Sequence, residues 1–198
     1  MIALIDYDAG NMKSVEKALQ LIGEDVLAAD KVVLPGVGSF GDAMENLHHF
    51  GLVPVIHQVV QEQTPFLGIC LGLQLLFEKS EESPGVEGLG ILKGEILRIP
   101  AAEGLKIPHM GWNNIRFPNK GRLFAGVPED AYVYFVHSYY LKAQDEKIVT
   151  ATTEYGTHIH ASVESGNLFA CQFHPEKSSH VGLQILKNFA KLEGKGGR

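Results

Sequence analysis

The first half of the chain alternates short, continuously apolar runs with stretches whose apolar residues recur every three or four positions. Runs of the first kind predict buried strands, and stretches of the second kind predict helices that bury one face. The predicted order is strand 2–6, helix 14–22, strand 32–34, helix 42–60 interrupted at Gly51 and Pro54, strand 66–69 and helix 71–79. Alternation of this kind is typical of a parallel sheet covered by helices on both faces.

The second half has a different pattern. Strand-like runs follow one another with turn residues between them, which is typical of antiparallel hairpins. These runs cover 91–99, 114–117, 132–140, 147–153, 158–163 and 168–173, and a helical pattern over 178–192 closes the chain. We therefore predict one α/β domain over 1–198, with a mostly parallel central sheet flanked by helices and antiparallel hairpins in its C-terminal half.

Composition narrows the class of protein. The chain has 198 residues, 45% of them hydrophobic and 20% charged, which suits a globular domain with a sizeable core. Its net charge of −6 and its lack of a basic cluster argue against nucleic acid as a partner. The N-terminus shows no signal-peptide pattern, and the longest uncharged apolar stretch, 66–77, is shorter than the about 20 residues of a membrane span. We expect a reducing, cytoplasmic setting in which Cys70 and Cys171 stay thiols, with no membrane contact.

The segment Gly68-Ile69-Cys70-Leu71-Gly72 lies between a predicted buried strand and a predicted helix. Small residues on both sides of a nucleophile, at a sharp strand-to-helix turn, form the nucleophile elbow. The helix N-terminus favours a thiolate at Cys70, and the Leu71 amide is placed to bind an oxyanion. A buried structural cysteine between two unrelated glycines is the alternative.

A cysteine nucleophile needs a base, and the base needs an orienting group. Phe173-His174-Pro175-Glu176 follows the predicted strand 168–173 and supplies both. If the strand alternation continues, His174 and Glu176 face the same side, and Pro175 ends the ladder. We predict a triad of Cys70, His174 and Glu176; a structural histidine at a strand end is the alternative.

The loop Pro35-Gly36-Val37-Gly38 follows another buried strand. Its spacing does not match the dinucleotide-binding fingerprint, so no nucleotide cofactor is expected. A backbone amide from Gly36 or Val37 could complete an oxyanion site opposite Leu71. A plain strand-terminating turn is the alternative.

The remaining histidines show no metal-binding spacing. His158 and His160 share a strand face, but no further motif accompanies them, so we expect a solvated strand face and no metal. His48, His49 and His57 lie in helical segments and are expected at the surface.

The elbow, extended over 68–74, and the Phe-His-Pro-Glu motif resemble those of the class I, or triad, glutamine amidotransferases. Within this family the similarity is greatest to the glutaminase subunits of imidazole glycerol phosphate synthases, because the stretches 108–113 and 137–140 are specific to them. Further matching stretches are 5–7, 10–11, 34–41, 135–136 and 172–178. The resemblance covers nearly the whole chain.

The resemblance implies a reaction. The Cys70 thiolate attacks the carboxamide of glutamine, and His174, oriented by Glu176, protonates the departing ammonia and then activates water against the thioester. The resemblance further implies that Leu71, Gly36 and Val37 bind the oxyanion. Gln74, Ser138 and Tyr139 are implied to hold the amino-acid portion of glutamine.

The resemblance also implies a partner. Family members form a heterodimer with a (β/α)₈-barrel cyclase, to which they pass ammonia for the synthesis of imidazole glycerol phosphate and aminoimidazole carboxamide ribotide. The residues expected at this interface are Asn11, Trp112, Tyr134 and Lys177.

The sequence departs from the family pattern at two places. Asp8 stands where the family commonly has glycine, and the interval 23–31 barely accommodates a strand that the family usually has there. We interpret the second departure as a loop missing from the sequence.

Two alternative functions stay open at this stage. One is a glutaminase that serves another synthase, for pyridoxal phosphate or anthranilate, against which the stretch 108–113 argues. The other is a non-catalytic docking subunit, which the intact Cys70, His174 and Glu176 disfavour.

Overall fold

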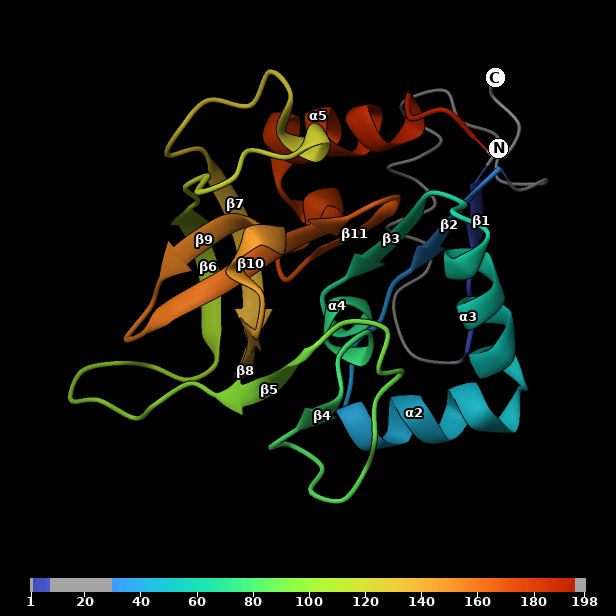
Figure 1. Cartoon of the computed structure of the whole chain (residues 1–198). Helices are drawn as coiled ribbons and strands as arrows, with labels where there is room; N and C mark the ends of the chain where they lie inside the picture. Colours follow the sequence, from blue (N-terminus) through green and yellow to red (C-terminus); the bar gives the residue numbers. More distant parts are fainter. Residues whose placement is uncertain (1, 8–29, 195–198) are drawn as a thin grey trace.

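The computed structural model describes residues 2–7 and 30–194 (Figure 1). The predicted helix 14–22, Asp8, Asn11 and most of the interval 23–31 lie outside the described residues.

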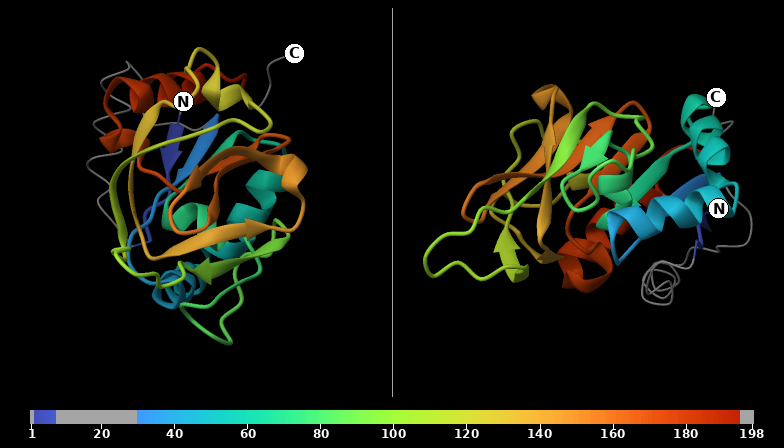
Figure 2. Two further views of the ribbon diagram at one scale, coloured as in Figure 1. Left: turned by 90° about the vertical axis from the view of Figure 1, so that its left-hand side faces the viewer. Right: turned by 90° about the horizontal axis from the view of Figure 1, so that it is seen from below.

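A sheet with a parallel half and an antiparallel half forms the centre of the molecule (Figure 1). Its strand order is β1-β2-β3-β11-β10-β8-β5-β4, with β9 paired to β10. The strands are β1 (Ile2–Leu4), β2 (Lys31–Leu34), β3 (Phe66–Ile69), β4 (Lys79–Ser80), β5 (Gly94–Arg98), β8 (Tyr139–Ala143), β9 (Val149–Glu154), β10 (His158–Ser165) and β11 (Leu168–Cys171). The first four strands in this order run parallel, and β10 is antiparallel to β11, β8 and β9. The antiparallel strands curl out of the plane of the parallel ones (Figure 2).

Helices cover both faces of the parallel half, as the continuous apolar runs predict. In β3, Leu67 and Ile69 pack into one core with α5 (Ser179–Ala190), whose Ile185 and Phe189 are fully buried. The alternate residue Phe66 packs on the other face, in the core that includes α2 (Phe40–His49) and α4 (Leu71–Leu75). The helix α3 (Leu52–Gln61) adjoins this second core. The predicted α/β fold is therefore confirmed.

The first-half helices differ in detail from the prediction. Gly51, at a left-handed φ of 65°, separates α2 from α3 as expected. Pro54 does not interrupt α3, because it lies in the first turn, where its missing N–H has no helical partner to lose.

The helix that follows β3 is shorter than predicted. α4 ends at Leu75 instead of continuing to Lys79, which belongs to β4. The N–H of Leu89 donates to the carbonyl of Leu75 at 2.8 Å, and Gly90 donates to Phe77 at 3.2 Å. A returning loop thus takes the carbonyls that a longer helix would use.

The second half contains two further corrections. The strand predicted over 114–117 is wrong: the strand found here is β6 (His109–Asn114), which shares only Asn114 with that run. Beyond it, Arg116 makes an isolated bridge to Thr152. The run predicted over 132–140 breaks at Ser138 into β7 (Tyr132–His137) and β8. β7 pairs with β6 in a separate two-stranded sheet, whereas β8 joins the main sheet.

Short 3₁₀ turns complete the described elements, at Arg122–Phe124, Glu146–Ile148 and Pro175–Lys177. In the part of the chain that the structure describes, no helix has the length and apolar character needed to cross a membrane.

Candidate active site

The nucleophile elbow forms as predicted between β3 and α4. Cys70 has φ 56° and ψ −108°, a conformation that L-residues rarely adopt. Its N–H donates to the carbonyl of Cys171 at 2.8 Å, which ties the turn to β11. The five residues of α4 provide a weaker dipole than the longer helix predicted from the sequence.

The two glycines of the elbow are required by close backbone approach. A Cβ at Gly72 would lie 1.9 Å from the carbonyl oxygen of Leu34, and one at Gly68 would lie 2.8 Å from the carbonyl oxygen of Gly72. Side chains at these positions would push β2, β3 and α4 apart. The two glycines are therefore required by the packing of this turn.

His174 and Glu176 form a buried pair. The Nδ1 atom of His174 lies 2.8 Å from Oε1 of Glu176, and both side chains are only 4% exposed. Strand alternation does not produce this arrangement, because β11 ends at Cys171 and Glu176 lies in the 3₁₀ turn Pro175–Lys177. Pro175 begins that turn and does not end the ladder.

Backbone contacts hold His174 in place. Its N–H donates to the carbonyl of Tyr134 at 2.9 Å, and its carbonyl accepts from the Ser178 hydroxyl at 2.6 Å. The same hydroxyl accepts from the N–H of Tyr134 at 3.0 Å. The histidine is therefore fixed both to β7 and to the start of α5.

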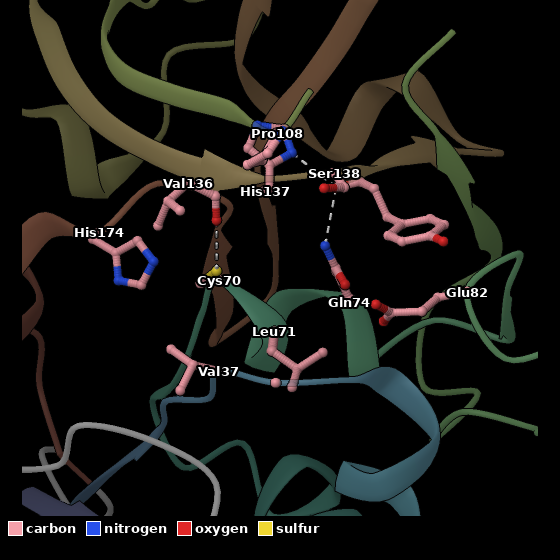
Figure 3. A pocket seen from close by; sticks show the side chains of 12 residues that line it. Val37, Cys70, Leu71, Gln74, Glu82, Pro108, Val136, His137, Ser138 and His174 are labelled. Atoms are coloured by element: carbon pink, nitrogen blue, oxygen red, sulfur yellow. Dashed lines mark hydrogen bonds between the residues drawn. The ribbon is translucent and has the colours of Figure 1, made fainter. Parts of the chain in front are cut away.

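The electrostatics of His174 are those of an ion-pair partner. Burial lowers the pKa of its imidazole, but interactions with Cys70 and Glu176 outweigh burial and raise that pKa to about 10. Its Nε2 atom has no aligned hydrogen-bond partner among the described residues. In Figure 3 the His174 ring lies on one side of the Cys70 sulfur, with Gln74 on the other.

A cavity of about 310 Å³ opens above Cys70 (Figure 3). Its lining includes most of the residues that the sequence singled out, namely Val37, Cys70, Leu71, Gln74, Ser138, Tyr139 and His174. The remaining lining residues are Gly38, Glu82, Pro108, Val136 and His137. Pro108, Val136 and His137 belong to stretches that carry the family resemblance, whereas no sequence signal marked Glu82.

The Gly36 loop approaches the elbow, but with a carbonyl instead of an amide. The N–H of Leu71 donates to the carbonyl of Gly36 at 3.3 Å. Gly36 must lack a side chain, since a Cβ there would lie 2.1 Å from the Tyr7 hydroxyl. In this structure the Leu71 amide is therefore engaged by the protein itself.

Gln74 is buried and not on a helix surface. Its Nε2 donates to the carbonyl of Tyr139 at 3.1 Å and to Oε1 of Gln172 at 3.0 Å. Gln172 in turn donates from Nε2 to the Cys70 sulfur at 3.7 Å. Gln172 was included in the motif stretches of the sequence, but nothing in its spacing indicated this contact.

The residues predicted for a partner interface are partly brought together. Trp112 and Tyr134 face each other across β6 and β7, with ring centroids 6.0 Å apart, and Trp112 is 52% exposed. Lys177 is exposed in the 3₁₀ turn after His174. Asn11 lies outside the described residues.

His158 and His160 differ in exposure. His158 is exposed and paired with Glu154, as expected for a solvated face. His160 is buried instead, and its Nδ1 accepts from the N–H of Ala143 at 3.1 Å. Within 2–7 and 30–194, no three His, Cys, Asp or Glu side chains are grouped as metal ligands. Cys70 and Cys171 are both free thiols.

The comparison with protein families agrees with this geometry. The family model described as glutamine amidotransferase class-I matches residues 9–192. The chain belongs to this family. Among solved structures, one described as a glutamine amidotransferase has a TM-score of 0.70 at 18% identity and covers 96% of this chain and 98% of its own. PurLQS from Thermotoga maritima has a TM-score of 0.69 at 19% identity, with 96% of each chain covered, so the two structures support the class-I fold.

Curated members of the family are much closer in sequence. Imidazole glycerol phosphate synthase subunit HisH of Moorella thermoacetica is 54% identical, over 96% of this chain and 94% of the relative. The subunit of the same name from Methanocaldococcus jannaschii is 47% identical, over 97% of this chain and 100% of the relative. The HisH subunit of Bacillus subtilis is 48% identical, over 97% of this chain and 96% of the relative. The similarity to these HisH subunits therefore extends over nearly the full chain.

Proposed function

We propose that the chain is the glutaminase subunit of an imidazole glycerol phosphate synthase, acting in histidine biosynthesis. The observation that carries the proposal is that Cys70 and His174 line one cavity, with His174 paired to the buried carboxylate of Glu176. The three HisH subunits that share about half of its residues support the choice of synthase. We further propose that the functional domain covers the whole of 1–198 and acts in the cytoplasm.

The proposed catalytic residues are Cys70, His174 and Glu176. The Cys70 thiolate attacks the side-chain carbonyl carbon of glutamine, and the raised pKa of His174 keeps the imidazole protonated beside it. His174 gives its proton to the amide nitrogen as the C–N bond breaks, and ammonia leaves a thioester on Cys70. Neutral His174 then takes a proton from water, which attacks the thioester and releases glutamate. Glu176 holds the imidazole through Nδ1, so Nε2 faces the reacting atoms.

The substrate residues are proposed from their place in the cavity. Gln74 and Ser138 lie on the side of the cavity away from His174 (Figure 3), and Tyr139 also lines it. Together they supply amide, hydroxyl and backbone groups. Glu82 adds a carboxylate to the same wall, which suits the α-ammonium group of glutamine.

The proposed oxyanion residues are Leu71, Gly36 and Val37. Since the Leu71 amide donates to the Gly36 carbonyl at 3.3 Å, an oxyanion must displace that carbonyl before it can use the amide. Turning the Gly36–Val37 peptide would remove the carbonyl and bring the Val37 N–H toward the same position. The proposal therefore requires this peptide to turn before the amides of Leu71 and Val37 can bind an oxyanion.

We propose that the partner is a (β/α)₈-barrel cyclase in a heterodimer, and that Asn11, Trp112, Tyr134 and Lys177 lie at the interface. The exposed Trp112 and its edge contact with Tyr134 provide the aromatic surface that interfaces favour. Ammonia released at Cys70 would be protonated in bulk water, so direct transfer to the partner suits the chemistry. L-Glutamine is the substrate; no metal, cofactor or nucleic acid takes part in the proposal.

The test is glutamate release from glutamine by the purified chain, with and without a (β/α)₈-barrel cyclase subunit and its nucleotide ligand. Cys70→Ala should lower turnover by about a thousandfold or more and leave complex formation intact. Cys171→Ala is the matched control, because Cys171 is buried in β11 and does not line the cavity. Retained turnover in Cys70→Ala would overturn the assignment. No turnover by the wild-type chain, even in the complex, would favour a docking subunit.

A further inference from the structure

Gln172 is fully buried directly after β11, and its side chain connects two parts of the site. Its backbone N–H donates to the carbonyl of Ala161 at 2.8 Å, which fixes the main chain. Its Oε1 accepts from Gln74, and its Nε2 donates to the Cys70 sulfur at 3.7 Å. Gln172 does not line the cavity, so the proposed mechanism leaves it without a role.

We propose that Gln172 is a positioning residue, whose amide N–H holds the Cys70 sulfur and stabilises it as a thiolate. This inference rests on the proposed function. It adds that a line of uncharged hydrogen-bonding groups keeps this amide in the correct orientation. The line consists of Gln74, the Tyr139 carbonyl, His137, His109 and Asn113.

The orientation follows from a single obligate acceptor, the carbonyl of Tyr139. A carbonyl cannot donate, so Gln74 must turn its Nε2 toward Tyr139. The same Nε2 then donates to Gln172, which must present Oε1 to Gln74. The Nε2 of Gln172 is thereby left facing Cys70. Reversal of either amide would bring two oxygens or two N–H groups together.

Two histidines extend the line on the other side of that carbonyl. His137 Nδ1 lies 2.8 Å from the carbonyl of Tyr139 and must carry the proton there. His137 Nε2 is then an acceptor for His109 Nδ1 at 3.0 Å. Asn113 donates to His109 Nε2 at 3.3 Å and closes the sequence of donors.

The line is uncharged throughout. Burial lowers the pKa of His109 to about 4 and that of His137 to about 3, so both imidazoles are neutral at pH 7. A neutral imidazole has one donor and one acceptor, which makes each tautomer unique in this arrangement. Charge near the thiolate comes from other groups.

Titratable groups close to Cys70 also affect the reactivity of its sulfur. Among residues 2–7 and 30–194, the titratable side chains with a resolved interaction with Cys70 are Tyr7 after β1, Cys171 in β11 and His174. Glu176 is bound to His174. None of them is altered when Gln172 is replaced by an apolar residue, so a change in Cys70 reactivity then reports the lost amide.

The experiment measures alkylation of Cys70 by iodoacetamide as a function of pH, in the full chain, with the labelled cysteine assigned by peptide mass spectrometry. Gln172→Met and Gln172→Leu both remove the amide and introduce no titratable group beside the sulfur. In both variants we expect the pH midpoint of alkylation to rise by about one unit, the equivalent of a tenfold weaker thiolate. Glutaminase kcat should fall about tenfold, with KM within about twofold, because Gln172 is not in the cavity wall.

The control is Gln144→Met, the same substitution at an exposed position, which should leave both measurements unchanged. An unchanged midpoint and kcat in both folded Gln172 variants would overturn the inference, as would a loss explained by KM alone. A wild-type chain that releases no glutamate would instead defeat the proposed function, while its alkylation midpoint would still report on Gln172.

The line behind Gln172 is tested at His137. His137→Gln retains a donor and an acceptor, whereas His137→Phe retains ring shape without hydrogen bonds. We expect the Gln variant to keep an alkylation midpoint closer to wild type than the Phe variant. The opposite order would show that ring packing, and not hydrogen bonding, is what His137 contributes.

Discussion

The conformation of Cys70 predicts that glycine is more stabilising than alanine at the nucleophile position. At φ 56° and ψ −108° the backbone of any residue with a Cβ is strained. Because this conformation lies outside the left-handed helical region, we take the strain as about 3 kcal/mol, the upper value for such residues. Two effects make Cys70→Gly less stable than Cys70→Ala. The missing methyl group removes about 0.8 kcal/mol of burial, and the greater freedom of glycine in the unfolded chain removes about 0.7 kcal/mol more. Relief of strain is larger, so the glycine variant should be more stable by about 1.5 kcal/mol.

The assay is urea and thermal unfolding of the two variants, both of which lack glutaminase activity. For a chain of this size we expect Cys70→Gly to unfold about 3–6 °C above Cys70→Ala. Ala43→Gly in α2 is the control of opposite sign, since Ala43 is buried in a regular helix and should lose about 1.5 kcal/mol. A Cys70→Ala protein as stable as the glycine variant would refute the argument that the elbow is strained.

Three further predictions follow from contacts around the site. Gly72→Ala should lose about 3 kcal/mol or more in urea unfolding, because its Cβ would lie 1.9 Å from the Leu34 carbonyl; an unfolding midpoint like wild type would contradict this close approach. Ser178→Ala leaves the N–H of Tyr134 unpaired and should cost about 2 kcal/mol with a fall in kcat, and unchanged stability would show that water replaces the hydroxyl. Burial lowers the pKa of His137 to about 3, whereas a histidine in the unfolded chain titrates near about 6.5. As the pH drops between these values, the unfolded chain binds a proton at His137 that the folded chain does not, so the free energy of unfolding should fall. His137→Phe should show a smaller fall over this range, and equal slopes would exclude His137 as a source.

The parts of the site that the sequence predicted are local in the chain. The elbow needs only five consecutive residues, and its glycines have the same steric reason in the structure as in the motif. His174 and Glu176 are two residues apart, so their contact survives even though the reason given for it, strand alternation, is wrong. Short-range geometry restricts such pairs regardless of the surrounding element.

The parts that were missed depend on long-range pairing. Gln172 and Cys70 are 102 positions apart, and they meet because β11 lies beside β3 in a parallel register. The break at Ser138 sends β7 and β8 to different sheets, which no local pattern distinguishes from one continuous strand. The early end of α4 likewise depends on a loop that returns to its carbonyls.

The features of this site that oppose folding therefore lie where neighbouring parallel strands end. A residue at positive φ, a buried His–Glu pair and buried amides each oppose folding when taken alone. Here β3 and β11 hold them, since the Cys70 N–H is bound by Cys171 and the adjacent Gln172 is bound by Ala161. The carboxyl ends of neighbouring parallel strands can support such groups because their backbone directions are fixed by the sheet. It follows that substitutions that relieve the strain should raise stability and abolish turnover together, whereas substitutions in the supporting contacts should lower both.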